Sequence, residues 1–198
     1  MVTHSFCGID SRAAISLFGA GSAVRTLTTV CSPHHGMRLI DNGLKFPEKC
    51  PIELAEKAFE AVGLSQKSAQ EFTSENISDF NKVAEDARGV EYFSIGAHKQ
   101  RLQSSDLLRT SHDSITIGSK PSTAQIGGIR SDGLVRPEES EWGRYLMTFP
   151  DHDHLDIVGF NPSYKPNTVY TLIVDNIRLS EIKEDPKEAR DYGVDHLF

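Results

Sequence analysis

The first thirty residues alternate between strand-like and helix-like segments, and this order limits the possible folds more than any other feature of the sequence. Residues 2–12 are typical of a strand that runs directly into a helix, and the apolar side chains of residues 11–18 recur at helical spacing. Residues 24–31 are rich in β-branched side chains and lie between turn formers, which predicts a second strand. Strand, helix and strand together form the unit of a parallel sheet, so the sequence predicts an α/β fold.

Ser5 lies at the turn between the first strand and the helix. In a nucleophile elbow, a serine occupies a strained turn of this kind, and small neighbours allow the helix to approach the strand closely. The two glycines of the G-x-S-x-G pattern are replaced here by Thr3 and Cys7, and Gly8 comes one position later. The segment by itself fits either an elbow or a serine that only caps the helix.

Composition excludes several classes of protein. A chain of 198 residues with 38% hydrophobic residues predicts one soluble domain, residues 1–198. The net charge of −7, without a basic block, disfavours nucleic acid and anionic membranes as partners. No segment is apolar enough to span a bilayer, and residues 1–20 do not resemble a signal peptide. The three scattered cysteines, Cys7, Cys31 and Cys50, predict free thiols in a reducing compartment.

The middle of the chain predicts a helical excursion followed by a strand and a long loop. Residues 51–87 have helical character, and we expect residues 45–88 to form a cap-like insertion over a pocket, with ordinary core packing as the alternative. Residues 90–96 predict a strand, and residues 98–130 are polar and predict a loop. A helix around Trp142 and a strand ending near Phe149 follow.

An acid and a base follow Ser5 in the order found in α/β-hydrolases. Asp132 begins an Asp-Gly-Leu-Val segment, and His154 lies in an Asp-His-Leu-Asp segment. A catalytic triad needs a histidine to take the serine proton and a carboxylate to orient the histidine. His152 is the rival base, although the context favours His154. Asp-Gly is also a common turn, and a histidine among acidic residues is often a surface residue.

Taken together, these segments resemble triacylglycerol lipases of the α/β-hydrolase superfamily, of the fungal mitochondrial and bacterial true-lipase type. Residues 4–12 (HSFCGIDSR) resemble the family's H-S-M-G-G-L-D-A-R, and residues 27–36 (LTTVCSPHHG) resemble L-T-T-I-S-T-P-H-R-G. Further similar segments are residues 80–81 (FN), 90–94 (VEYFS), 132–135 (DGLV), 142–143 (WG) and 153–156 (DHLD). The resemblance covers nearly the whole chain and implies the C-terminal half of the fold.

The resemblance implies a role for each matched residue. Ser5 would be the nucleophile, Asp132 the triad acid and His154 the general base, and the backbone N–H of Phe6 would form half of the oxyanion hole. In the family, the other half comes from a His-Gly segment upstream of the elbow. Because several strands also precede the elbow in that fold, we expect an N-terminally truncated product. His34 and His35 are expected to brace the turn after the second strand.

Asp156 has a second possible role. In bacterial lipases of this type, the aspartate of His-Leu-Asp binds a structural Ca²⁺, which requires several further oxygen ligands. Asp106 is the one loosely placed candidate for a second carboxylate. The alternative for Asp156 is an aspartate that only braces its loop. No other cofactor is expected.

The sequence therefore predicts a serine hydrolase that cleaves acylglycerol esters through an acyl-enzyme. One alternative is a non-catalytic remnant or interaction module of the same fold. Another is an esterase, thioesterase or acyltransferase that uses the same triad. We expect a lipid ester as the substrate, transient contact with a lipid surface, and a mitochondrial or cytoplasmic location.

Overall fold

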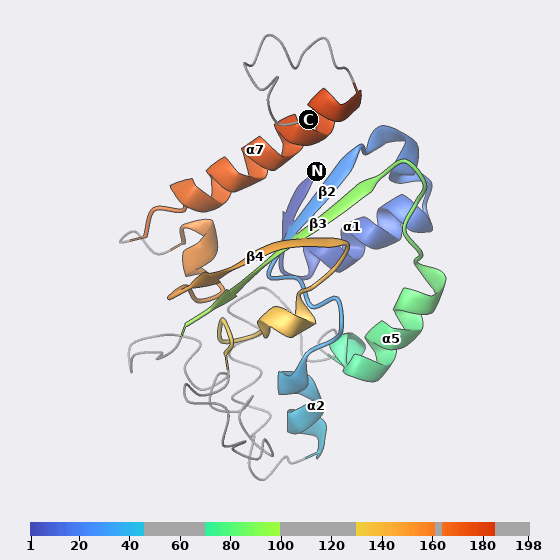
Figure 1. The fold of residues 1–198 in the computed structure, drawn as a ribbon. Helices are drawn as coiled ribbons and strands as arrows, with labels where there is room; N and C mark the ends of the chain where they lie inside the picture. Colours follow the sequence, from blue (N-terminus) through green and yellow to red (C-terminus); the bar gives the residue numbers. More distant parts are fainter. Residues whose placement is uncertain (46–69, 100–129, 161–163, 185–198) are drawn as a thin grey trace.

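A single parallel sheet organises the molecule. The structure, a computed structural model, describes residues 1–45, 70–99, 130–160 and 164–184 (Figure 1). Its strands are β1 (Val2–His4), β2 (Thr26–Val30), β3 (Glu91–His98) and β4 (Arg144–Pro150). They lie in the order β1-β2-β3-β4, and each neighbouring pair is parallel. The predicted α/β fold is confirmed.

Helices cover both faces of this sheet. The described helices are α1 (Cys7–Ser16), α2 (Arg38–Lys45), α5 (Ser74–Val83) and α7 (Asn167–Glu184), with short 3-10 helices at Ala20–Ala23, Gln70–Phe72, Pro137–Glu139 and Asp156–Val158. Of these, α1 and α7 pack on the strands. Helix α7 lies across the sheet from α1 (Figure 1). No helix in the described ranges is both long and apolar enough to cross a membrane.

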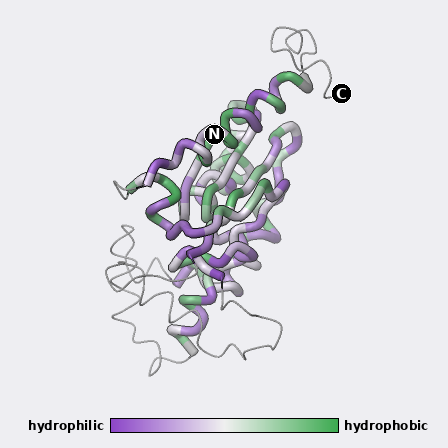
Figure 2. Tube along the Cα trace, turned by 60° about the vertical axis from the view of Figure 1, so that its left-hand side comes forward, coloured by the Kyte–Doolittle hydropathy of each residue, from purple (hydrophilic) through white to green (hydrophobic). Residues whose placement is uncertain are grey.

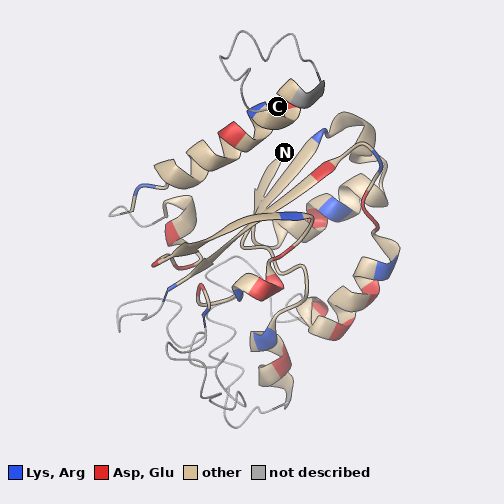
Figure 3. Ribbon diagram, viewed as in Figure 1, with Lys and Arg blue, Asp and Glu red and all other residues tan. Residues whose placement is uncertain are grey.

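Alternating strand residues form two hydrophobic clusters. Val30, Ile95 and Phe149 pack with Val169 and Ile173 of α7 on one face. On the opposite face, Ile15 of α1 packs with Leu27, Val90 and Tyr92. The hydrophobic residues gather along the central strands (Figure 2), and charges on the sheet lie mainly where strands begin (Figure 3). This pattern is expected for a parallel sheet that is covered on both faces.

The carboxyl ends of the strands meet along one edge. His4 of β1 pairs with Val30 of β2, which pairs with Ile95 of β3. The ladder continues one residue further, because the N–H of Ser5 donates to Val30 O (2.9 Å) and that of Cys31 donates to Ile95 O (2.8 Å). In open α/β sheets, this edge is where binding sites form.

Helix α1 begins at Cys7, directly after the turn, so the predicted order of strand, turn and helix is confirmed. The structure corrects one predicted element. The expected helix around Trp142 is wrong: a single 3-10 turn ends at Glu139, and Trp142 leads into β4. The hydroxyl of Ser94 binds both the carbonyl (2.7 Å) and the N–H (2.8 Å) of Trp142. These hydrogen bonds hold the segment against β3, so its backbone groups are not free for a helix.

Parts of two other predictions lie outside the described residues. Within the expected cap-like insertion 45–88, residues 46–69 are not described, whereas residues 74–83 form α5. Thr73 begins this helix, since its side chain accepts a hydrogen bond from the N–H of Asn76 (3.2 Å). The strand predicted at residues 90–96 extends to His98, and residues 100–129 of the expected loop lie outside the described ranges.

Candidate active site

Ser5 occupies a left-handed turn between β1 and α1. Its φ of 57° is uncommon for a residue with a side chain and is found mainly where surrounding structure enforces it. The hydrogen bond from its N–H to Val30 O fixes the start of the turn, and α1 begins two residues later. This strand, turn and helix geometry is that of a nucleophile elbow.

Gly8 allows α1 to approach β2 at the elbow. A Cβ at this position would lie 2.2 Å from Ser32 Oγ and 2.6 Å from Ser32 Cβ, so no larger residue fits without movement. Cys7 is exposed, so its side chain does not separate the helix from the sheet. The elbow therefore forms with the small residue one position later than the G-x-S-x-G pattern requires.

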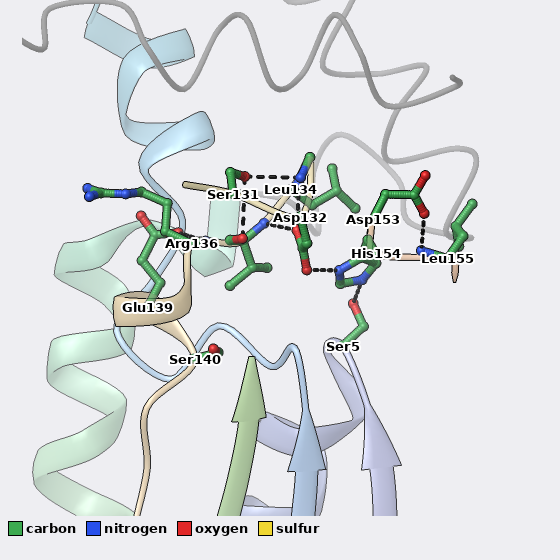
Figure 4. Close-up of polar contacts among 12 residues, drawn as sticks. Ser5, Ser131, Asp132, Leu134, Arg136, Glu139, Ser140, Asp153, His154 and Leu155 are labelled. Carbon is green, nitrogen blue, oxygen red and sulfur yellow. Dashed lines mark hydrogen bonds and ion pairs between the residues drawn. The ribbon is translucent and has the colours of Figure 1, made fainter. Parts of the chain in front are cut away.

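Three side chains far apart in sequence meet at this turn (Figure 4). His154 Nε2 lies 2.8 Å from Ser5 Oγ, and His154 Nδ1 lies 2.7 Å from Asp132 Oδ2. The N–H of His154 also donates to the carbonyl of Asp132 (2.8 Å), which joins the two loops. All three residues are buried. The structure thus brings together the serine, acid and base that the sequence singled out.

The carboxylate of Asp132 is held in its charged form. Its Oδ1 accepts hydrogen bonds from the N–H groups of Leu134 (2.9 Å) and Val135 (2.7 Å). Burial raises the pKa of Asp132, but the charge of His154, its hydrogen bond and these two donors outweigh burial and lower that pKa below its usual value. A buried carboxylate kept ionised can orient an imidazole and stabilise its protonated form.

Known proteins resemble this chain in sequence and in fold. Triacylglycerol lipase 2 of Saccharomyces cerevisiae is 27% identical over 165 residues, which is 81% of this chain and 45% of that protein. The mature lipase of Bacillus licheniformis superposes with a TM-score of 0.65 at 18% identity, over 88% of this chain and 63% of that one. The lipase of Staphylococcus hyicus superposes with a TM-score of 0.61 at 15% identity, over 92% of this chain and 70% of that one. No protein-family model matches the chain.

The chain has the α/β-hydrolase fold of these lipase structures. It spans 45% of the length of its yeast relative. In this chain, the elbow follows the described edge strand β1, and Asp132 and His154 lie beyond β3 and β4.

Phe6 begins the helix that follows the nucleophile turn. It is the N-cap of α1, with φ −60° and ψ −29°, and its ring packs against Phe72 (centroids 4.3 Å apart). N–H groups at a helix start have no partner within the helix and carry partial positive charge. The N–H of Phe6 is therefore a candidate anion donor next to Ser5, and its role in an oxyanion hole stays a prediction.

His152, the rival base, lies outside the triad. Its Nδ1 contacts the carbonyl of Pro150, and its ring packs edge-on against Tyr164 (4.3 Å) and Phe149 (6.0 Å). These contacts anchor the beginning of the loop that carries His154. Of the two histidines, only His154 therefore contacts Ser5 in the part of the chain that the structure describes.

His4 lies directly beside the base, a contact that the sequence did not reveal. Burial, followed by the charge of His154, lowers the pKa of His4 to about 3. His4 is therefore neutral near pH 7, and its ring forms an uncharged wall for the imidazole of His154.

The carboxylate of Asp156 pairs with an ammonium group. Lys99 Nζ lies 2.9 Å from Asp156 Oδ2 and 3.3 Å from Asp153 Oδ2. Burial lowers the pKa of Lys99, but hydrogen bonding to Asp156 and the charges of both aspartates outweigh burial and raise that pKa. Ca²⁺ requires six to eight oxygen ligands. Two carboxylates that already hold an ammonium do not fit this ion, and Asp106 lies outside the described residues.

One group of atoms that could bind a metal ion includes two members of the triad. Cys31, Asp132 and His154 offer a sulfur, an oxygen and a nitrogen within 4.8 Å of one another. Burial and the nearby charge of Asp132 raise the pKa of the Cys31 thiol well above its usual value, and metal binding requires the thiolate. The imidazole and the carboxylate already bind each other and Ser5, so this group is better explained as two members of the triad beside a buried, protonated Cys31 than as a metal site.

Arg12 forms a buried cationic centre behind the elbow that the sequence did not predict. Its guanidinium donates to Asn81 Oδ1 (2.8 Å) and to the carbonyl of Ala84 (3.0 Å), and it lies 3.4 Å from the centroid of the Trp142 ring. His34 Nδ1 is 3.5 Å away, while His34 Nε2 lies 2.9 Å from Thr29 Oγ1. This network joins α1, α5 and the segment before β4, and His34 braces its turn.

Proposed function

We propose that the protein is a serine hydrolase that cleaves the carboxylic esters of acylglycerols through an acyl-enzyme on Ser5. The observation that carries this proposal is the 2.8 Å contact between Ser5 Oγ and His154 Nε2, made from a left-handed turn. The substrate class is supported by the yeast relative, which is a triacylglycerol lipase by name.

The geometry accounts for each chemical step. His154 Nε2 accepts the proton from Ser5 Oγ as that oxygen attacks the ester carbonyl, and Asp132 stabilises the imidazolium that forms. The N–H of Phe6 donates to the developing oxyanion. His154 then protonates the leaving alcohol, and a water molecule activated in the same way hydrolyses the acyl-enzyme.

The non-catalytic alternative is not favoured. One of the two arguments for it was the presence of Thr3 and Cys7 in the elbow, but Cys7 is exposed, and His154 lies within hydrogen-bonding distance of both Ser5 and Asp132. The other argument was the part of the fold expected before the elbow, and an activity test of Ser5 addresses it. An esterase, thioesterase or acyltransferase could use the same residues. Comparing turnover of long-chain triacylglycerols, short-chain esters and acyl thioesters separates these possibilities, and predominant turnover of thioesters would contradict the proposed substrate.

A fluorophosphonate probe tests the nucleophile directly. The full-length protein should be labelled at Ser5, and Ser5→Ala should abolish labelling and ester hydrolysis. Ser22→Ala, at an exposed position, serves as the matched control and should change neither. Equal labelling of the protein with and without Ser5 would overturn the proposal.

Replacement of the acid tests the triad independently. Asp132→Asn retains the side-chain shape but favours the wrong histidine tautomer, so kcat should fall by about 10⁴-fold. An unchanged kcat would show that Asp132 does not orient the base. The compartment, mitochondrial or cytoplasmic, stays a prediction that fractionation of cells would test.

A further inference from the structure

Lys99 contacts both loops that carry the acid and the base. We name residues 131–135 the acid loop and residues 151–156 the histidine loop. The backbone N–H of Lys99 donates to the carbonyl of Ser131 (2.9 Å), the residue before the triad acid. Its ammonium binds Asp153 and Asp156, which stand on either side of His154. One residue at the end of β3 therefore joins two loops that must stay in register.

The ion pair is largely shielded from water. The exposed fractions of the side chains are 19% for Lys99, 12% for Asp153 and 8% for Asp156. Exposed ion pairs contribute little to stability because water and salt screen them, whereas partly buried pairs are screened much less. This pair therefore differs from the exposed contact between Lys82 and Asp79 on α5, whose side chains are 70% and 67% exposed.

The two aspartates shape the backbone around the base. Asp153 Oδ1 accepts hydrogen bonds from the N–H groups of Leu155 (3.0 Å) and Asp156 (2.8 Å), and Asp156 Oδ2 accepts one from the N–H of Asp153 (3.3 Å). Two carboxylates this close repel each other unless a cation lies between them. The ammonium of Lys99 contacts both carboxylates and supplies such a cation from within the chain.

We propose that Lys99 is a positioning residue that fixes the histidine loop against the acid loop, so that its ammonium takes the place of a loop-bracing metal ion. The catalytic consequence rests on the proposed function. The contacts of 2.7 Å and 2.8 Å that His154 makes depend on both loops, and a displacement of about 1 Å between reacting groups can cost ~100-fold in rate.

Charge removal at Lys99 tests the catalytic part. Lys99→Met retains the length of the side chain and should lower kcat and the rate of fluorophosphonate labelling about tenfold or more, with little change in KM. Lys99→Arg should restore most of the rate, because it retains the charge. Lys82→Met removes an exposed ion pair and should have no effect. Equal rates for the wild type and Lys99→Met would overturn the proposal.

Hydrogen exchange measured by mass spectrometry tests the positioning of the two loops without an activity measurement. Lys99→Met should increase amide exchange in peptides that cover both the acid loop and the histidine loop, and Lys82→Met should not. If Lys99→Met does not fold, Asp153→Asn weakens the same pair and retains the Oδ1 acceptor, so it should increase exchange in the same loops. Unchanged exchange overturns the positioning role, whereas absence of Ser5 labelling in the wild type refutes only the proposed function.

Metal dependence provides the last comparison. Labelling and loop exchange of the wild type should be the same in EDTA and in millimolar calcium chloride. A loss in EDTA that calcium restores would show that a metal ion, rather than Lys99, braces the histidine loop.

Discussion

The imidazole of His4 lies against that of His154, with ring centroids 4.5 Å apart and ring planes inclined by 43°. The residue before the nucleophile thus packs on the base, although 149 residues separate Ser5 from His154. The contact limits how far the His154 ring can tilt away from Ser5. A charged His4 would oppose the imidazolium that the proposed reaction forms, so its neutral state suits the site.

Replacing His4 should reduce the loss of stability in acid. An unfolded histidine binds a proton near pH 6.5, whereas the folded pKa of His4 is about 3, so the free energy of unfolding falls as the pH drops from 6.5 toward 3. The slope for one such group is at most ~1.4 kcal/mol per pH unit. His4→Gln should make the free energy of unfolding depend less steeply on pH, as measured by urea unfolding at several pH values. Exposed His35→Gln is the control, and an unchanged slope in His4→Gln would contradict the prediction.

Adding a methyl group at Gly8 should disturb the elbow. Gly8→Ala places its Cβ against Ser32, and overpacking of this kind costs about 1–3 kcal/mol in the free energy of unfolding. Chemical denaturation would measure this loss, with Cys7→Ala at the exposed neighbouring position as the control.

Removal of the Ser32 side chain tests the same contact. Ser32 Oγ is buried without a hydrogen-bond partner, so Ser32→Gly removes the clash without breaking a hydrogen bond. The double variant Gly8→Ala, Ser32→Gly should be more stable than the sum of the single changes predicts. Additive effects would show that the helix does not meet the sheet at Gly8.

Arg12 should contribute strongly to stability. Arg12→Met leaves the acceptors of Asn81 and Ala84 without their donors and removes the cation from the Trp142 ring, so the free energy of unfolding should fall by about 2–5 kcal/mol. Arg88→Met, at an exposed position, should change it by less than about 0.5 kcal/mol. Urea denaturation followed by tryptophan fluorescence measures both, and similar values for the two variants would contradict this role.

The cysteines should differ in reactivity. Burial, followed by the charge of Asp132, raises the pKa of the Cys31 thiol, and thiolates are the species that react with iodoacetamide. Cys7 is exposed and should be alkylated in the folded protein, whereas Cys31 should react only after denaturation. Peptide mass spectrometry would identify the modified residue. Equal alkylation rates in the folded state would show that Cys31 is accessible.

Local patterns predicted the strands better than the helices around them. Apolar, β-branched runs identified β2 and β3 because strand formation depends on nearby residues. The helix expected around Trp142 rested on the length of chain between Asp132 and His154 rather than on a local pattern, and hydrogen bonds to Ser94 of another strand instead hold this backbone. A tertiary contact therefore decided the structure of this segment.

The sequence by itself determined which residues could form a triad, because Ser5, Asp132 and His154 lie in recognisable segments and in the right order. Their catalytic roles stay predictions, although the structure brings the three together. Only the tertiary structure decided what surrounds them: His4 against the base, Lys99 between the aspartates and Arg12 behind the elbow. These contacts join residues distant in sequence, and they form because the parallel sheet aligns its strand ends at one edge.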